Sequence, residues 1–255
     1  MSPRSNTSIL GSLLREVTGE PRDHLKRWHE NGGLGAENVL TAEVLQGLDF
    51  LPRQHFLGAV ISELNGNVLL AREKLLVEIE RASVSMLAER FCLRSSEKSH
   101  ARQGDVRPDG ILESPSVFCL IESKRKGGSF APEQLAREFV IAAREAEAKG
   151  RLPMLMLILG EEPPVRVRDA GRQAVQVAIL EKLENVRSMT EGYSKTYAEL
   201  RVMVDTSVAW TTWGGIADIV RRQMQTCTVE SQSVHDSIQR LADAVIGAIG
   251  RHGLS

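Results

Sequence analysis

The chain has 255 residues, of which 42 % are hydrophobic and 25 % are charged, and its formal net charge is -1. This is the composition of a soluble globular protein, long enough for one full domain with a helical extension. The near-zero charge gives no case for binding nucleic acid through overall charge, so any phosphate contact must come from a local basic cluster. The three cysteines lie far apart in the sequence, which excludes a disulfide framework and a Cys-x-x-Cys zinc site.

The chain contains no signal for membrane insertion or export. Its first residues are polar, and no apolar stretch approaches the ~20 residues that span a bilayer. We therefore expect a cytoplasmic protein of bacterial or phage origin, without a membrane partner.

The N-terminal part, 1–67, predicts a helical accessory segment. It holds a short helix over 9–17, a Gly-rich stretch, and an amphipathic pattern over 41–64 that Pro52 interrupts. A core over 68–222 is expected to follow. This core begins with one long helix up to Leu93, because neither Gly nor Pro breaks the apolar periodicity there.

Two apolar segments, 107–113 and 117–121, follow a polar loop. The second is a run of five apolar residues, which predicts a strand buried on both faces. The Ser-Pro-Ser between the segments is rich in turn formers, so we expect a hairpin that brings Asp109 near Glu122. Because side chains alternate across a strand, Glu122 and Lys124 should point the same way.

The rest of the chain predicts an alternation of helices and strands. In the helix expected over 132–149, Pro132 suits the first turn and Gly150 ends the helix. In chain order the elements are a helix over 132–149, a strand over 152–159, a mainly helical insertion over about 165–200, a strand over 207–212 and a helix over 213–222.

The C-terminal segment, 223–255, predicts an amphipathic helix. Its apolar residues recur at spacings of three and four. We expect this helix to pack on its own domain, with a dimer contact as the alternative.

The Pro-Asp pair that ends at Asp109 and the Glu122-x-Lys124 triplet resemble the PD-(D/E)XK nuclease superfamily. The thirteen positions from Asp109 to Glu122, with a hairpin between them, suit that family. The resemblance covers about 68–160 and, more loosely, 205–222. It implies a restriction-endonuclease-like α/β fold, with a central mixed β-sheet flanked by helices and extra N- and C-terminal helices. The alternative is a surface hairpin with a weak exposed ion pair, which accounts poorly for the unbroken apolar run.

The resemblance also implies a metal site and a catalytic lysine. Asp109 and Glu122 would bind Mg²⁺ or Mn²⁺ through carboxylates and Ser123 through its backbone carbonyl, since such ions prefer oxygen ligands. Lys124 would position or help deprotonate the attacking water. Members of the superfamily often carry a further acid on the preceding helix. Glu80 is our candidate because it lies beside the apolar stripe, and a solvated helix-face glutamate is the alternative.

Three further residues are candidates for substrate binding. Gln134 follows Lys124 by ten positions, in a region where the RecB-like branch has a Gln followed four residues later by an aromatic residue. Here Glu138 takes the aromatic position, so the match is incomplete, but Gln134 can still hydrogen-bond the substrate or Lys124. Arg125 and Lys126 form a basic loop that suits phosphate contact, with a solvated turn as the alternative.

Analogy with the superfamily indicates a nuclease that cuts DNA, in bacterial defence or restriction. No separate DNA-reading domain is visible, so target choice would depend on a homo-oligomer or a partner subunit. One alternative is a catalytically silent scaffold with the nuclease fold, which a test of metal binding would separate from an active enzyme. The other is an RNA-directed nuclease, which cleavage of matched DNA and RNA would separate from one that cuts DNA. Fold alone does not decide among them.

Overall fold

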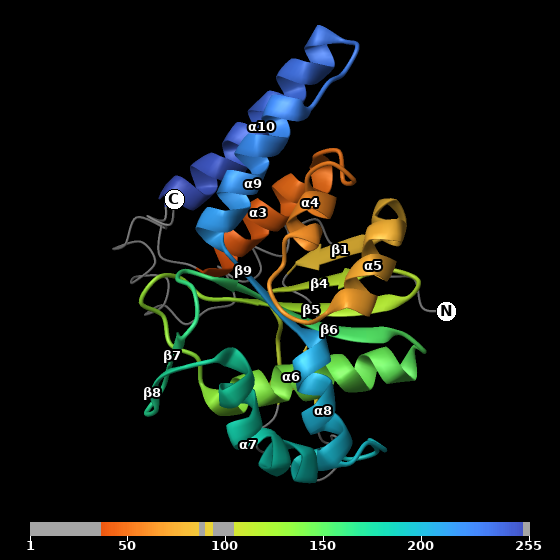
Figure 1. Ribbon diagram of the computed structural model, residues 1–255, viewed down its shortest axis with the longest axis vertical. Helices are drawn as coiled ribbons and strands as arrows, with labels where there is room; N and C mark the ends of the chain where they lie inside the picture. The colour runs from red at the N-terminus through yellow and green to blue at the C-terminus, as the bar shows by residue number, and fades with distance from the viewer. Residues whose placement is uncertain (1–36, 87–89, 94–104, 252–255) are drawn as a thin grey trace.

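The computed structural model describes residues 37–86, 90–93 and 105–251. The helix predicted over 9–17 lies outside these residues. The centre of the fold is a five-stranded sheet with the order β1-β4-β5-β6-β9 (Figure 1). Its first three strands pair antiparallel and its last three pair parallel, so the sheet is mixed. The strands are β1 (Ser83–Met86), β4 (Gly110–Glu113), β5 (Val117–Ser123), β6 (Leu152–Leu159) and β9 (Val208–Thr212).

The predicted hairpin is formed by β4 and β5. Gly110 pairs with Ile121 at one end of the ladder and Glu113 with Phe118 at the other. All seven residues of β5 are buried, as the unbroken apolar run predicts. The turn of the hairpin is held from outside, because the Glu78 carboxylate accepts hydrogen bonds from the hydroxyls of both turn serines.

The parallel strands are connected by helical crossovers, which this geometry requires. The helix α6 (Pro132–Ala148) connects β5 to β6, in the predicted place. The helices α7 (Val175–Met189) and α8 (Tyr197–Ser207) precede β9.

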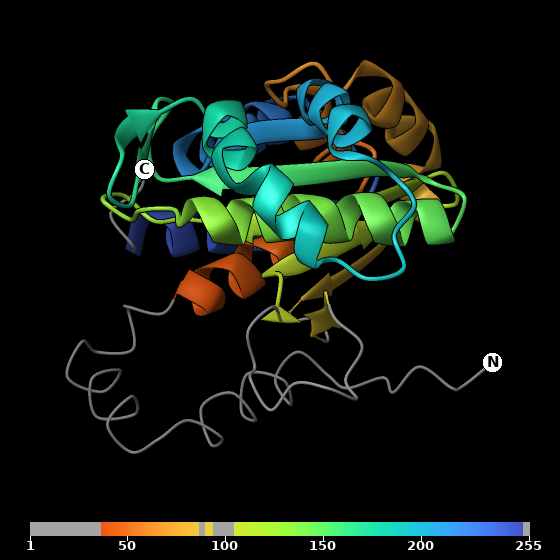
Figure 2. The ribbon, with the colours of Figure 1, turned by 90° about the horizontal axis from the view of Figure 1, so that it is seen from below.

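Helices cover both faces of the sheet, so the predicted α/β fold with a mixed central sheet flanked by helices is confirmed. The helices α6, α7 and α8 pack on one face, which Figure 2 shows from the side of these helices. Along β5, Cys119 and Ile121 face the other helical layer while Leu120 faces the α6 layer. That other layer consists of α3 (Glu37–Phe50), α4 (Leu57–Ser62), α5 (Leu69–Glu78), α9 (Trp213–Thr226) and α10 (Gln232–Arg251).

The C-terminal helix α10 confirms the amphipathic pattern seen in the sequence. It packs against α3 and α9, and its apolar face, which includes Ala242 and Val245, is buried. None of the helices that the structure describes combines the length and the apolar character needed to cross a bilayer.

The single long helix predicted from residue 68 to Leu93 is wrong. The helix α5 ends at Glu78, a 3-10 turn covers Ile79–Arg81, and β1 begins at Ser83. The segment from Ser83 forms a ladder with β4, and this long-range pairing prevails over a weak helical propensity. A second short pair, β2 (Phe91–Cys92) with β3 (Asp105–Val106), is also extended rather than helical.

The segment from 165 is not helical at its start either. It opens with an antiparallel hairpin of β7 (Val165–Val167) and β8 (Gly171–Gln173). Val165 and Val167 are buried while Arg166 between them is exposed, which is the alternation of a strand. The turn places Asp169 and Gly171 at positive φ, which a helix excludes. Helices follow only from Val175.

Candidate active site

Three predicted site residues meet where the β4–β5 hairpin opens. Asp109 directly precedes β4, and Glu122 and Ser123 are the last two residues of β5. Gly110 pairs with Ile121, so one further step along the ladder sets Asp109 opposite Glu122. Both side chains are buried, with 9 % of Asp109 and 2 % of Glu122 exposed. The predicted approach of the two acids is therefore confirmed.

Lys124 directly follows β5, and its backbone is hydrogen-bonded to two neighbouring elements. Its amide donates to the carbonyl of Ile158 at 2.8 Å, which continues the β5–β6 ladder by one residue. Its carbonyl accepts from the indole Nε1 of Trp213 at 3.2 Å, and Trp213 is fully buried at the start of α9. Two neighbouring elements thus fix the position of the lysine.

The ammonium group of Lys124 lies against the acids. Its Nζ donates to Glu122 Oε1 at 2.8 Å and to the carbonyl of Ser123 at 2.9 Å. The side chains of Lys124 and Glu122 are only 16 % and 3 % exposed. The alternative of a weak ion pair on an exposed hairpin is therefore excluded.

The Asp109 carboxylate is oriented by Ser123 and, through it, by α3. Asp109 Oδ2 accepts from the backbone amide of Ser123 at 2.8 Å and from its hydroxyl at 2.6 Å. The Ser123 hydroxyl is in turn 2.7 Å from the hydroxyl of Thr41, which is buried in α3. The N-terminal segment thus supports the site directly. No motif in the sequence marks Thr41, because the contact joins residues 82 positions apart.

Gln134 joins the site and brings in a second glutamate, Glu138, which the sequence marked only as a departure from the expected aromatic residue. Gln134 Nε2 lies 2.8 Å from Glu122 Oε1 and 2.8 Å from Glu138 Oε1. Glu138 is only 1 % exposed, and its Oε2 has no hydrogen-bond partner among the described residues. A signal was present in the sequence, because Glu138 lies one helical turn after Gln134 and directly before the buried Phe139.

The electrostatics of this cluster favour a bound cation or a bound proton. Burial raises the pKa of Glu122 well above its ordinary value, the carboxyls of Glu138 and Asp109 raise it further, and Lys124 only partly offsets this. Burial likewise raises the pKa of Glu138 to about 7. Glu122 and Glu138 are thus two buried carboxyl groups close to the Lys124 ammonium, in a site where burying charge is costly.

The cluster opens into a pocket of about 220 Å³. The pocket combines carboxylate oxygens, two cationic side chains and amide groups, which suits a ligand that carries both a cation and an anion. Its lining residues are Asn38, Arg107, Pro108, Asp109, Glu122, Lys124 and Gln134.

The structure does not bring Glu80 to this pocket. The 3-10 turn that holds Glu80 leads into Ser83, which pairs with Glu113 at the far end of β4. Glu80 Oε1 instead accepts from the backbone amide of Gln54 at 3.1 Å. The choice of Glu80 as a metal ligand is therefore unsupported, because it assumed a helix that ends two residues earlier.

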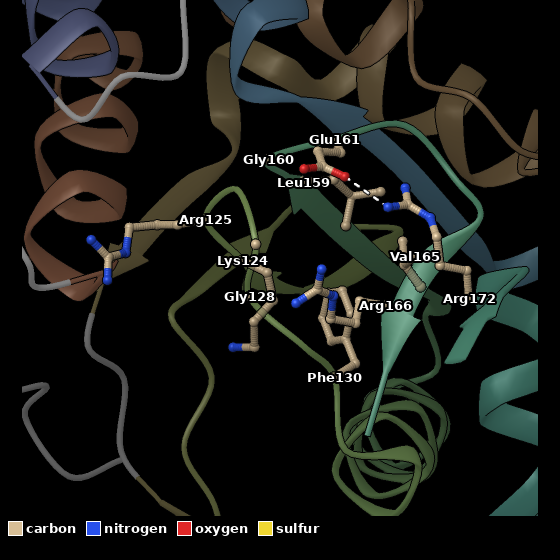
Figure 3. Close-up of a pocket in the computed structure, with 11 residues that line it drawn as sticks. Lys124, Arg125, Gly128, Phe130, Leu159, Gly160, Glu161, Val165, Arg166 and Arg172 are labelled. Carbon is tan, nitrogen blue, oxygen red and sulfur yellow. Dashed lines mark hydrogen bonds and ion pairs between the residues drawn. The ribbon is translucent and has the colours of Figure 1, made fainter. Parts of the chain in front are cut away.

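Arg125 and Lys126 follow the lysine on the loop that leaves β5. Lys126 is exposed and Arg125 is half-buried. In Figure 3 the Arg125 side chain extends away from Lys124. Both remain close to the site through the backbone, but neither lines the acidic pocket in the described part of the chain.

The oxygen donors of the site fit a hard divalent cation. Within residues 37–86, 90–93 and 105–251, no three His, Cys, Asp or Glu side chains form a group that could hold a metal ion. Mg²⁺, however, is commonly held by one or two carboxylates and keeps several waters. Asp109, Glu122 and the Ser123 carbonyl supply such a set, and the unpartnered buried oxygen of Glu138 adds negative charge beside it.

Comparison of the chain with protein-family models, with curated proteins and with solved structures found no significant match.

Proposed function

We propose that this protein is a metal-dependent phosphodiester hydrolase that cuts DNA. The observation that carries the proposal is the convergence of Asp109, Glu122 and Lys124 on one pocket, at the start of β4 and the end of β5. The same three residues carry the resemblance to PD-(D/E)XK nucleases, and the mixed sheet flanked by helices is compatible with that fold.

Asp109 and Glu122 would hold Mg²⁺ or Mn²⁺, together with the carbonyl of Ser123. When bound, such an ion neutralises charge on the scissile phosphate and lowers the pKa of a bound water. Hydrogen bonds within the protein orient the two carboxylates, Asp109 and Glu122, for this role. Ser123 fixes the Asp109 carboxylate through two hydrogen bonds, and Gln134 fixes Glu122 through one.

Lys124 orients the attacking water or a phosphate oxygen. Its ammonium lies on the pocket wall, 2.8 Å from a Glu122 oxygen. Its backbone is tied to Ile158 and Trp213, and its ammonium is held by Glu122 and the Ser123 carbonyl. The group therefore needs little reorganisation on binding, and this kind of preorganisation lowers reaction barriers. Gln134 lies on the same wall and can donate to the substrate.

The proposal extends to the substrate and the setting by analogy. DNA is the proposed substrate, bacterial defence or restriction is the proposed role, and a second copy or a partner subunit is proposed to set target choice. RNA is the alternative substrate, since both nucleic acids carry the phosphodiester that this site would attack.

The test is cleavage of supercoiled plasmid with Mg²⁺, Mn²⁺ or EDTA by the wild type, Lys124→Ala and Lys182→Ala. Lys182 is an exposed lysine on α7, so its variant matches the charge change outside the site. We expect metal-dependent cutting by the wild type and by Lys182→Ala, and none by Lys124→Ala. Cutting that survives in Lys124→Ala contradicts the assignment. Labelled single- and double-stranded DNA and RNA of one sequence then rank the substrates.

A further inference from the structure

A second hollow also has Lys124 in its lining (Figure 3). It lies between the loop that leaves β5 and the β7–β8 hairpin. Neither Arg166 nor Arg172, the two arginines that the hairpin contributes, lines the acidic pocket. Lys124 lines both this hollow and the acidic pocket, so the two are adjacent. Its cationic lining residues are Lys124, Arg125, Arg166 and Arg172, and Glu161 is the acid among its lining residues.

The hairpin is fixed beside the loop by backbone contacts. The Phe130 amide donates to the carbonyl of Arg166 at 2.9 Å, and the Arg168 amide donates to the carbonyl of Phe130 at 2.8 Å. Phe130 itself is buried, and the Lys124 ammonium lies 5.5 Å from the centroid of its ring. The position of Arg166 relative to Lys124 is therefore set by the fold and not by a free loop.

Arg166 and Arg172 are direct cross-strand partners in the β7–β8 ladder. Like charges placed directly opposite each other destabilise a strand pair. Arg172 is balanced by Glu161, whose Oε2 lies 2.9 Å away. The Arg166 guanidinium makes no hydrogen bond or ion pair with any residue that the structure describes, and Figure 3 shows it extending toward Lys124 and Phe130. The β7–β8 pair thus carries an exposed guanidinium, that of Arg166, near Lys124, and none of the described residues gives it a negatively charged partner.

The hollow is small, with a volume of about 20 Å³, so an anion would lie at its mouth and offset the positive charge there. Guanidinium groups bind phosphate through paired N–H donors. A nucleic acid strand carries phosphates at regular intervals, so a strand with one phosphate at Lys124 presents a neighbouring phosphate to a site next to it. Protein contacts to phosphates position the strand without reading its sequence.

We infer that the β7–β8 hairpin binds the backbone of the nucleic acid strand beside the scissile phosphate, with Arg166 as the principal phosphate contact and Arg172 as its support. The inference rests on the proposed function, because it uses the strand that the acidic pocket would cut. It assigns strand positioning to a segment that the sequence pattern predicts to be helical.

The test is the salt dependence of nucleic acid binding, measured in EDTA so that no metal-dependent cleavage interferes. Fluorescence anisotropy of a labelled duplex is followed against KCl concentration for the wild type, Arg166→Gln, Arg166→Lys and Arg201→Gln. Arg201 is an exposed arginine on α8, so Arg201→Gln removes the same charge away from the hollow. Circular dichroism confirms that the variants fold.

Loss of one phosphate contact lowers the slope of log affinity against log salt by about 1. We expect this change, with weaker binding, in Arg166→Gln, partial recovery in Arg166→Lys, and a wild-type slope in Arg201→Gln. An equal slope in Arg166→Gln and Arg201→Gln overturns the inference, and plasmid cutting by the wild type would then leave the proposed function standing.

Two other outcomes separate the inference from the proposed function. An Arg166-dependent slope in a protein that cuts no nucleic acid with either metal supports the strand contact and overturns the hydrolase. Absence of any binding to duplex or single strands at low salt overturns the strand contact.

Discussion

Glu122 and Glu138 share one hydrogen-bond donor, since the amide Nε2 of Gln134 lies 2.8 Å from an oxygen of each. The two glutamates come from different elements, β5 and α6, and both are buried. One neutral amide cannot compensate two buried negative charges. The Lys124 ammonium, 2.8 Å from Glu122 Oε1, offsets only part of this charge. Without a bound metal ion, the pair is therefore most stable when it retains a proton, which is the direction in which burial shifts both pKa values.

This pair predicts a pH-dependent stability in the absence of metal. Burial raises the pKa of Glu138 from 4.5 to about 7 in the folded protein. Between these values the folded chain holds a proton that the unfolded chain releases, so stability falls as pH rises through this window. Below it both states are protonated and no penalty exists. Relative to Glu138→Gln, the wild type should lose up to about 3 kcal/mol across the window.

The measurement is urea unfolding in EDTA from acidic to mildly alkaline pH. Glu147→Gln is the matched control, because Glu147 is exposed near the other end of α6. The control should follow the wild type, whereas Glu138→Gln should show a flatter profile and be the more stable protein above neutral pH. Parallel profiles for the wild type and Glu138→Gln would mean that Glu138 carries no such penalty.

Asp109→Ala should lose metal affinity, whereas Lys124→Ala should lose cleavage and keep metal affinity. Asp109→Ala removes a proposed ligand, so we expect Mn²⁺ affinity, measured by calorimetry, to fall at least about tenfold. Lys124→Ala removes a positive charge from beside the ion, so it should bind Mn²⁺ at least as tightly as the wild type. Cleavage should nevertheless fall by about 100-fold or more, which is the usual effect of losing a group that acts on the attacking water.

Glu80→Ala is the matched acid control for both measurements. Glu80 accepts a hydrogen bond from Gln54 outside the pocket, so Mn²⁺ affinity and cleavage should stay within about twofold of the wild type. A loss of metal affinity in Glu80→Ala comparable to that in Asp109→Ala would return Glu80 to the site.

Thr41→Val should weaken the support of the Asp109 carboxylate while it preserves side-chain shape. The Ser123 hydroxyl would lose its contact with Thr41, and one buried hydrogen bond contributes about 1 kcal/mol to stability. We expect a stability loss of that order by thermal unfolding, together with weaker Mn²⁺ binding. Thr206→Val, at an exposed position of α8, should change neither. Unchanged Mn²⁺ affinity in Thr41→Val would restrict Thr41 to a packing role.

The parts of the site that the sequence predicts are those formed by local contacts. The β4–β5 hairpin brings Asp109 and Glu122 together over a few residues of chain, so strand pattern and turn chemistry were enough to predict it. The remaining parts depend on distant segments. The identity of β1 depends on pairing with β4, and Thr41 reaches Ser123 across 82 positions. Neither is visible in a local pattern.

Side-chain environment was the other quantity that local pattern did not provide. Glu138 lies on the face of α6 that packs on the sheet, among buried residues. In the sequence it is only a departure from the aromatic residue that the RecB-like pattern has at this position. Its role follows from the distance to Gln134 and from its burial, which are properties of the folded chain.

Gly160 directly follows β6 and lies against the loop that leaves β5. A Cβ at this position would overlap backbone atoms of Arg125 and Lys126, and backbone cannot rotate away as a flexible side chain can. Gly160→Ala should therefore displace the loop that carries these residues and pull on Lys124. Overpacking of this kind costs about 1–3 kcal/mol, and a small displacement of a catalytic group costs activity as well.

Gly247→Ala is the matched control in α10. The nearest atom to its added Cβ is 3.5 Å away, at the end of the flexible Arg251 side chain. Because Ala is a better helix former than Gly, this variant should be stabilised by up to about 1 kcal/mol. Thermal unfolding and single-turnover cleavage should show a loss of both stability and rate in Gly160→Ala alone. Full cleavage in a destabilised Gly160→Ala would mean that Lys124 keeps its place through Ile158 and Trp213 without the loop.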